Sequence, residues 1–307
     1  NSSDSDDDSI DVTIDIPRAD ISDLKEYYPK QMGKEALNWL DTSLLKGVAN
    51  NTKVVMRGKL KDFPFIDNKN NPDENEGIFR ITSKITGSEI EYGTNWPNAE
   101  KFNIDFKLNA SRIEFTSETG EIADNKIISF KGVIPNFTDD VTMLNIDAEL
   151  DSPLNTMIKF INSSPVKDEM QGRSEGLLGD GSGKLRLSLK IPLSDVDNLT
   201  YDGIYSFQNS SLESPELDLP LLQKMNGDLF FNLEKVSITN LKATIYDEPL
   251  LISLSNANQK TVLNVQGFIN TDLIESKLGE KWSERIYGNT PWNAQMVIDE
   301  KESFFSL

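Results

Sequence analysis

The chain has 307 residues, with 31 lysines and arginines against 50 aspartates and glutamates, and a formal net charge of -19 at pH 7. So acidic a chain opposes binding to nucleic acid and is repelled by an anionic lipid surface. It has no cysteine, which excludes disulfides and thiolate metal sites, and no histidine, which removes the commonest general base and metal ligand. The composition therefore counts against a nucleic-acid partner and lowers the expectation of an enzyme.

The first elements along the chain are a leader, a strand and a helix. Residues 1–9 are polar and acidic, and are predicted to be disordered. Apolar residues alternate from Ile10 to Ile16, which predicts a half-buried strand that ends at Pro17. Between residues 30 and 46 the apolar residues recur at three- and four-residue steps, which predicts an amphipathic helix. No run approaches the ~20 apolar residues of a membrane-spanning helix.

Strand patterns dominate residues 77–146. In segments such as residues 104–108, apolar residues alternate with charged or polar ones. This period of two predicts antiparallel strands with one apolar and one solvated face. A short helix follows at residues 153–163, where four apolar residues share one face.

The second half of the chain repeats this organisation. Residues 167–183 are rich in glycine, serine and charge, and are predicted to form a flexible loop. One-sided strands follow from residue 184, and a last helix is predicted at residues 272–287. The order of strands that starts at Gly77 is found again, at weak identity, from Gly203. Such a repeat predicts units that stack because none can bury its apolar face alone.

Seven stretches carry a resemblance to a known family. They are YYPKQMGKEALNWLDTSLLKG, GKLKDFPF, GIFRI, IEYGTNWP, FINSSPV, GSGKLRLSLKIPL and KMNGDLFFN. They resemble, in order and spacing from about Tyr27 to Leu254, the YhdP branch of the AsmA-like proteins, distant relatives of TamB. The Trp-Leu helix followed by G-x-L-x-D-F-P-F is quite specific.

This resemblance implies a long envelope protein of a diderm bacterium, anchored at its N-terminus in the inner membrane and crossing the periplasm. It implies antiparallel strands that curl into an open groove, which conducts phospholipid toward the outer membrane without catalysis or a cofactor. The implied partners are phospholipid acyl chains and other envelope proteins, with membrane contact only through parts outside this segment. The abrupt start and end of the chain also predict an internal section of something longer.

The predicted fold is therefore mostly β: an elongated, curled antiparallel sheet of repeating units, with about three short helices. Residues 10–166 would form the first β-groove unit and residues 184–307 the second. A diacyl lipid has roughly 30 methylenes at ~0.8 kcal/mol each, so only a continuous apolar surface could shelter it from water. The predicted lining of the groove is Ile104, Phe106, Leu108, Ile113, Phe115, Leu185, Leu187, Leu189, Ile191, Leu229, Phe231, Leu233, Leu241 and Ile245.

Two other hypotheses stay open at this point. The same alternation fits a β-sandwich whose two apolar faces close on each other, as in a structural or adhesive module of a surface protein. A carboxylate-based hydrolase is the third hypothesis, because the chain has many acids. Residues 172–176 match the G-x-S-x-G motif of hydrolases, but there is no histidine to take the serine proton. Residues 179–185 are similar to a phosphate-binding loop, but lack its first glycine and its Ser or Thr.

Overall fold

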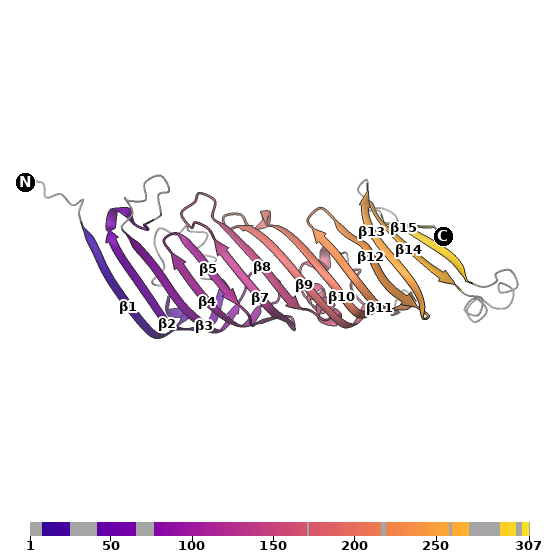
Figure 1. The fold of residues 1–307 in the computed structure, drawn as a ribbon, viewed down its shortest axis with the longest axis horizontal. Coiled ribbons are helices and arrows are strands. Elements are labelled where there is room, and N and C mark those ends of the chain that lie inside the picture. The colour runs from indigo at the N-terminus through magenta and orange to yellow at the C-terminus, as the bar shows by residue number, and fades with distance from the viewer. Residues whose placement is uncertain are drawn as a thin grey trace, which may run out of the picture. The chain divides into compact units, whose positions relative to one another are not determined.

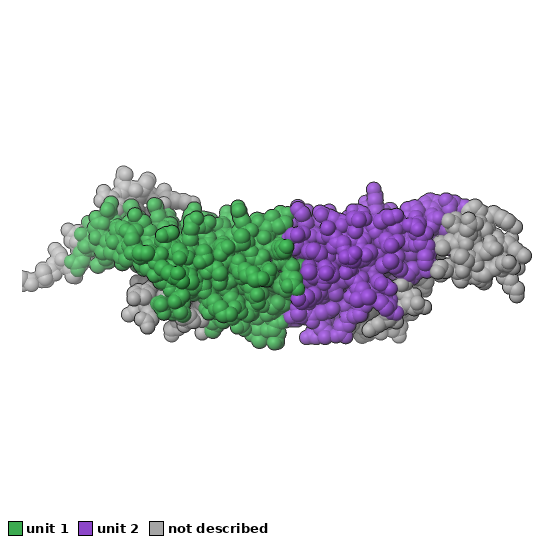
Figure 2. Space-filling model, turned by 90° about the horizontal axis from the view of Figure 1, so that it is seen from below, with its two compact units in different colours: residues 1–150, 188–200 green, residues 151–187, 201–307 purple. Residues whose placement is uncertain are grey.

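The computed structural model describes residues 8–24, 42–65, 77–170, 172–215, 219–257, 260–269, 289–298 and 303–306. The chain divides into two compact units, shown in separate colours in Figure 2. Unit 1 comprises Asn1–Leu150 and Ser188–Thr200, and unit 2 comprises Asp151–Leu187 and Tyr201–Leu307.

Sixteen strands account for most of the described residues. The first eight are β1 (Ser9–Asp20), β2 (Leu44–Lys59), β3 (Ile78–Ile90), β4 (Ala99–Asn109), β5 (Arg112–Ser117), β6 (Glu121–Ile122), β7 (Asn125–Ile134) and β8 (Met143–Asp151). The other eight are β9 (Leu178–Pro192), β10 (Thr200–Ser214), β11 (Leu219–Asn232), β12 (Val236–Ile245), β13 (Glu248–Ala257), β14 (Lys260–Ile269), β15 (Thr290–Ile298) and β16 (Ser303–Ser306). The described α-helices are α1 (Ile21–Leu24), α3 (Leu154–Asn162) and α4 (Val166–Glu169), with short 3-10 helices at Leu60–Asp62 and Val196–Asn198.

The strands form a single antiparallel sheet in which spatial order follows chain order (Figure 1). Of the described strands, only β6 leaves this path, because it pairs with β4 and β7 beside the main ladder. Among the described residues, the end strands β1 and β16 have one partner each. The mostly β, antiparallel prediction with about three short helices is confirmed. A β-sandwich needs two stacked sheets, so the single sheet argues against that alternative.

β1 continues past Pro17, where the sequence predicted its end. Ile16 pairs with Thr52 and Arg18 pairs with Asn50, so the register skips the proline. On β2, Asn51 lies between these two partners, and it has a left-handed φ of 52°. A proline lacks the N–H needed by the ladder, but an edge strand or a bulge tolerates it. β1 is such an edge strand among the described residues, and it reaches Asp20.

Two of the predicted helices fall largely outside the described residues. The helix predicted at residues 272–287 lies wholly outside them, as do residues 30–41 of the first helix. The end of that first prediction is wrong, because Leu44–Lys46 form the start of β2. Leu44 pairs with Ile90 of β3. A single apolar residue at the end of a helical pattern also fits the period of a strand, so the pattern does not show where the helix ends. The helix expected at residues 153–163 corresponds to α3.

The glycine-rich stretch predicted as a flexible loop is in part a strand. Residues 178–183 begin β9, after α4 and a series of turns. A Cβ on Gly179 would lie 2.6 Å from Cγ of Leu154, and one on Gly183 would lie 2.1 Å from the hydroxyl of Tyr205. Gly179 and Gly183 therefore make room for neighbouring side chains within a strand, and they do not mark a linker.

The two units are also divided differently from the prediction. β9 contributes to both, because Leu178–Leu187 belong to unit 2 and Ser188–Pro192 belong to unit 1. The predicted boundary at residues 167–183 therefore lies within unit 2. Of the predicted disordered leader, residues 1–7 lie outside the described residues and Ser9 is the first residue of β1.

Candidate functional site

Strand register places the predicted lining residues of unit 1 on one face of the sheet. Phe106 of β4 pairs with Phe115 of β5, and Leu108 pairs with Ile113. The alternation continues across the neighbouring strands as rows of directly opposed apolar residues. One such row crosses six strands through Ile14, Val54, Ile81, Leu108, Ile113 and Ile134. We call this side of the sheet the apolar face of unit 1.

The opposite side of the sheet is charged and solvated. Arg57 Nε lies 3.0 Å from Asp11 Oδ2, and Lys84 Nζ lies 3.7 Å from Asp105 Oδ1, with all four side chains largely exposed. Such surface ion pairs contribute about 0–1 kcal/mol each, so they keep this face soluble more than they stabilise it. The alternation of the strands thus separates a charged face from an apolar one.

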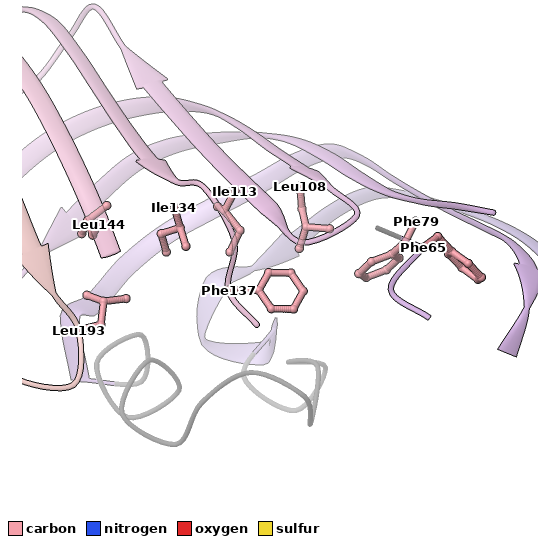
Figure 3. Close-up of a cluster of buried hydrophobic side chains, with 8 residues drawn as sticks. All are labelled: Phe65, Phe79, Leu108, Ile113, Ile134, Phe137, Leu144 and Leu193. Atoms are coloured by element: carbon pink, nitrogen blue, oxygen red, sulfur yellow. The ribbon is translucent and has the colours of Figure 1, made fainter. Parts of the chain in front are cut away.

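One end of the apolar face of unit 1 is closed by residues from the connections between strands. The buried cluster there comprises Phe65, Phe79, Leu108, Ile113, Ile134, Phe137, Leu144 and Leu193 (Figure 3). Phe137 is held over the sheet because its N–H donates to the carbonyl of Ser111 at 2.8 Å. Leu193 is held in the same way by the carbonyl of Thr142 at 2.9 Å. In Figure 3 the strands bend over this cluster, so its side chains lie on the concave side.

The middle of the same face is only partly covered. Six apolar side chains of the strands pack against the cluster and yet remain half-buried: Met56, Ile81, Phe106, Phe115, Ile146 and Ile191. We call these six residues the half-buried strip. Farther along β4, Phe102 and Ile104 are buried again. An apolar ligand would therefore meet hydrocarbon and aromatic side chains between two closed zones.

Polar groups on the apolar face are bonded within the protein. The hydroxyls of Thr52 and Ser83 lie 2.7 Å apart, and the Ser88 hydroxyl donates to the carbonyl of Phe102 at 2.9 Å. In the part of the chain that the structure describes, no buried side-chain nitrogen or oxygen is without a partner. Covering Thr52, Ser83 and Ser88 with hydrocarbon would therefore leave none of these three hydroxyls unpaired, which avoids a cost of about 1–3 kcal/mol per group.

Unit 2 has an apolar face of the same kind. Its buried cluster comprises Met225, Leu241, Ala243, Leu250 and Ile252. Half-buried side chains packed against this cluster are Phe207, Leu212, Leu222, Ile238, Ile245, Leu263, Val265 and Trp292. The strand register again produces directly opposed rows, such as Leu241, Ile252, Val265 and Ala294 across four strands. The apolar face of unit 2 is thus lined by residues from both the cluster and its half-buried neighbours.

The predicted lining residues differ in how far they are accessible. The buried ones are Ile104, Leu108, Ile113, Leu185 and Leu241. The half-buried ones are Phe106, Phe115, Leu187, Leu189, Ile191, Leu229, Phe231 and Ile245. On β9, Ser188 donates to Asp147 at 2.7 Å on the charged side, which places Leu187 and Leu189 on the other side. The accessible residues are the ones that remain candidates for ligand contact.

Leu233 does not belong with the other predicted lining residues. β11 ends at Asn232, whose side-chain oxygen accepts the N–H groups of Glu234 and Lys235, both at 3.0 Å. Leu233 therefore lies in a turn, where it is 60% exposed. Its position two residues after Phe231 continued the alternation in the sequence although the strand had ended.

Several face residues were not among the sequence candidates. In unit 1 these include Val54, Met56 and Ile81, and in unit 2 they include Ile252 and Val265. The period-two signal was present in LLISLS and VLNVQG of β13 and β14. It was weaker in KVVMRG of β2, where three consecutive apolar residues hide which ones share a face.

Helix α3 packs on the start of β9 within unit 2. Leu154 and Ile158 are its buried residues, and both lie against Gly179. The Tyr205 hydroxyl donates to the carbonyl of Ser152, just before the helix, at 2.9 Å. Tyr205 is 2% exposed, and burial raises the pKa of its phenol above the ordinary value of about 10. The neutral phenol of Tyr205 therefore anchors the connection between β8 and α3 to the sheet.

Replacing Tyr205 with phenylalanine is expected to lower the free energy of unfolding by about 1 kcal/mol, the usual net value of one hydrogen bond. The ring would still fill its site beside Gly183, so the fold should persist. Urea unfolding followed by circular dichroism measures the difference. An unchanged midpoint would show that the hydrogen bond to Ser152 contributes nothing to stability.

In the described part of the chain, the two stretches that resembled enzyme motifs have structural roles. Ser174 of the G-x-S-x-G stretch is 1% exposed and donates to Oδ1 of Asn162 at 2.6 Å, an amide that cannot act as a base. The stretch that resembled a phosphate loop lies in β9. Among the residues that the structure describes, no three His, Cys, Asp or Glu side chains are grouped to hold a metal ion. These findings leave the apolar faces as the candidate site.

The fold and the candidate site define a class: a long antiparallel meander with one charged face and one apolar face that is partly uncovered. Within this class the chain belongs to the YhdP family, because the family model "YhdP protein" matches residues 3–307. It is 24% identical over 288 residues to "Intermembrane phospholipid transporter YhdP" of Escherichia coli (strain K12), covering 92% of this chain and 22% of that protein. The chain thus spans about a fifth of the relative's length. No solved structure matches it.

Proposed function

We propose that this chain is a noncatalytic section of a bridge that conducts phospholipid along its apolar faces between the inner and outer membranes. The observation that carries the proposal is the half-buried strip, a set of apolar side chains on a single sheet with a charged opposite face. The similar E. coli protein is named an intermembrane phospholipid transporter, which supports phospholipid as the cargo.

The energetics of an acyl chain favour this use of the face. Each methylene removed from water contributes about 0.8 kcal/mol, and the side chains that it covers gain as well. Contacts of this kind have no fixed direction, so an acyl chain can slide from one strand to the next without breaking a specific bond. A ladder of apolar rows therefore supports passage of the lipid, whereas a single deep pocket would support storage.

The location that we propose is the periplasm of a diderm bacterium, with the full-length protein anchored in the inner membrane. Membrane contact and contacts with other envelope proteins would be made by parts of the protein outside this segment, since the relative is far longer. None of the helices described by the structure combines the length and the hydropathy needed to cross a bilayer.

Site-specific photocrosslinking tests the proposal directly. A benzophenone amino acid at position 106 would lie in the half-buried strip, and one at position 107 would lie on the charged face of the same strand. After irradiation in a diderm host, mass spectrometry is expected to find phospholipid attached at position 106 and none at position 107. Equal labelling at both positions, or none at either, would contradict the proposal.

A further inference from the structure

Two glycines on the apolar faces lie directly opposite phenylalanines of a neighbouring strand whose rings lie over them. Gly132 of β7 pairs with Phe115 of β5, and Gly203 of β10 pairs with Phe231 of β11. Both glycines are buried, whereas both phenylalanines are half-buried. The first pair lies in unit 1 and the second in unit 2, and at both the sheet face is accessible.

The rings occupy the space that any side chain on these glycines would need. A Cβ on Gly132 would lie 1.9 Å from Cε2 of Phe115, and a Cβ on Gly203 would lie 2.1 Å from Cζ of Phe231. Two carbon atoms in contact are ~3.5–4.0 Å apart, so each ring lies on the bare backbone of its neighbouring strand. Neither glycine has the positive φ that would explain it by backbone conformation.

Two described neighbours restrict where a displaced Phe115 ring can move. Phe130, two residues before Gly132, stacks beside Phe115 with ring centroids 6.1 Å apart and an interplanar angle of 22°. The buried cluster of unit 1 packs against Phe115 as well. A side chain at position 132 would therefore push the ring away from the sheet, into the space above the half-buried strip.

A third glycine serves as an internal comparison. A Cβ on Gly183 would lie 2.1 Å from the hydroxyl of Tyr205, but this tyrosine is buried and fixed by its hydrogen bond to Ser152. At that position the glycine serves packing alone. Around Gly132 and Gly203 the ring remains accessible, so its height above the sheet affects what can lie on the face.

We propose that Gly132 and Gly203 are positioning residues for lipid: they let the rings of Phe115 and Phe231 lie against the bare backbone of the neighbouring strand and so set the clearance for an acyl chain. The inference rests on the proposed function, since it concerns the same apolar faces. The acyl chain would pass over these rings, and raising either ring would obstruct its passage.

The test compares lipid binding by the wild-type chain and by Gly132→Ala. Each protein is incubated with phosphatidylethanolamine vesicles and repurified, and the bound phospholipid per folded protein is quantified by mass spectrometry. Gly132→Ala is expected to bind about tenfold less, equivalent to ~1.4 kcal/mol. Lys131→Ala, one residue away on the charged side, is expected to bind as the wild type does.

A second substitution shows whether Gly132→Ala loses lipid because the ring is raised or because the fold is damaged. Phe115→Leu keeps the glycine and removes the ring, so its own lipid binding is the reference level for the double variant. Adding Phe115→Leu to Gly132→Ala should restore binding, because the new methyl group then has no ring to raise. Failure of the double variant to regain lipid, with both variants folded, would overturn the inference. Gly203→Ala repeats the test in unit 2 if Gly132→Ala does not fold.

The outcomes distinguish the inference from the function on which it rests. If the wild-type chain binds no phospholipid, the proposed function fails and the inference falls with it. If the wild type binds and a folded Gly132→Ala variant binds equally, the inference is overturned while the function stands. Thermal unfolding of every variant shows whether a loss of lipid merely follows a loss of stability.

Discussion

Replacing Phe106 with aspartate is expected to abolish phospholipid binding while the chain stays folded. Phe106 is half-buried in the centre of the strip and pairs directly with Phe115. A carboxylate there would have to be covered by hydrocarbon whenever a lipid bound, at a cost of several kcal/mol, whereas in the empty protein water can reach it. Mass spectrometry of an organic extract measures the lipid, and circular dichroism measures the fold.

The matched control is Lys107→Asp, on the charged face of the same strand, which should leave lipid binding unchanged. Leu187→Asp is the corresponding change in unit 2, where Leu187 is half-buried. If Phe106→Asp instead unfolds the protein, Phe106 is part of a sealed core and the strip is not a site for lipid.

Replacing Phe65 with alanine is expected to have the largest effect on stability, a loss of about 3–5 kcal/mol. Phe65 is 3% exposed and lies over Gly58 and Gly77, where added Cβ atoms would come within 2.7 Å and 2.0 Å of its ring. Its ring also contacts Phe63 edge-on, with centroids 5.9 Å apart. Truncation would leave a large cavity that the two glycines cannot fill.

Urea unfolding of the chain, followed by tyrosine and tryptophan fluorescence and circular dichroism, measures this loss. Phe268→Ala is the control, because Phe268 is 46% exposed and should cost under about 1 kcal/mol. An equal cost for the two variants would show that the cluster around Phe65 does not close the end of the apolar face.

The alternation of apolar and charged residues was enough to predict the sheet and the side on which most lining residues lie. Phe106 and Phe115, for instance, were identified from separate short segments and are direct partners in the structure. Period two is a local property of a strand, so sequence reveals it without knowledge of the neighbours. The family was identified in the same way, from local motifs.

Accessibility could not be predicted, because it depends on contacts between distant residues. Leu108 is buried and Phe106 is half-buried although they are two residues apart on one strand. The difference arises because Phe137 and Leu193 fold back over one end of the face, held by backbone hydrogen bonds that no side-chain pattern records. The strand within residues 178–183 was missed for a related reason, since the partners of its glycines lie on α3 and β10.

The meander has a consequence for how the protein is made. Apart from the small β6, each strand bonds to the strands that immediately precede and follow it in the sequence. Every new hairpin can therefore add to the growing edge as soon as it emerges, with a small loss of loop entropy at each step. A chain of this design can fold progressively from its first strand, and adding a hairpin would lengthen it without a rearrangement of the strands already in place.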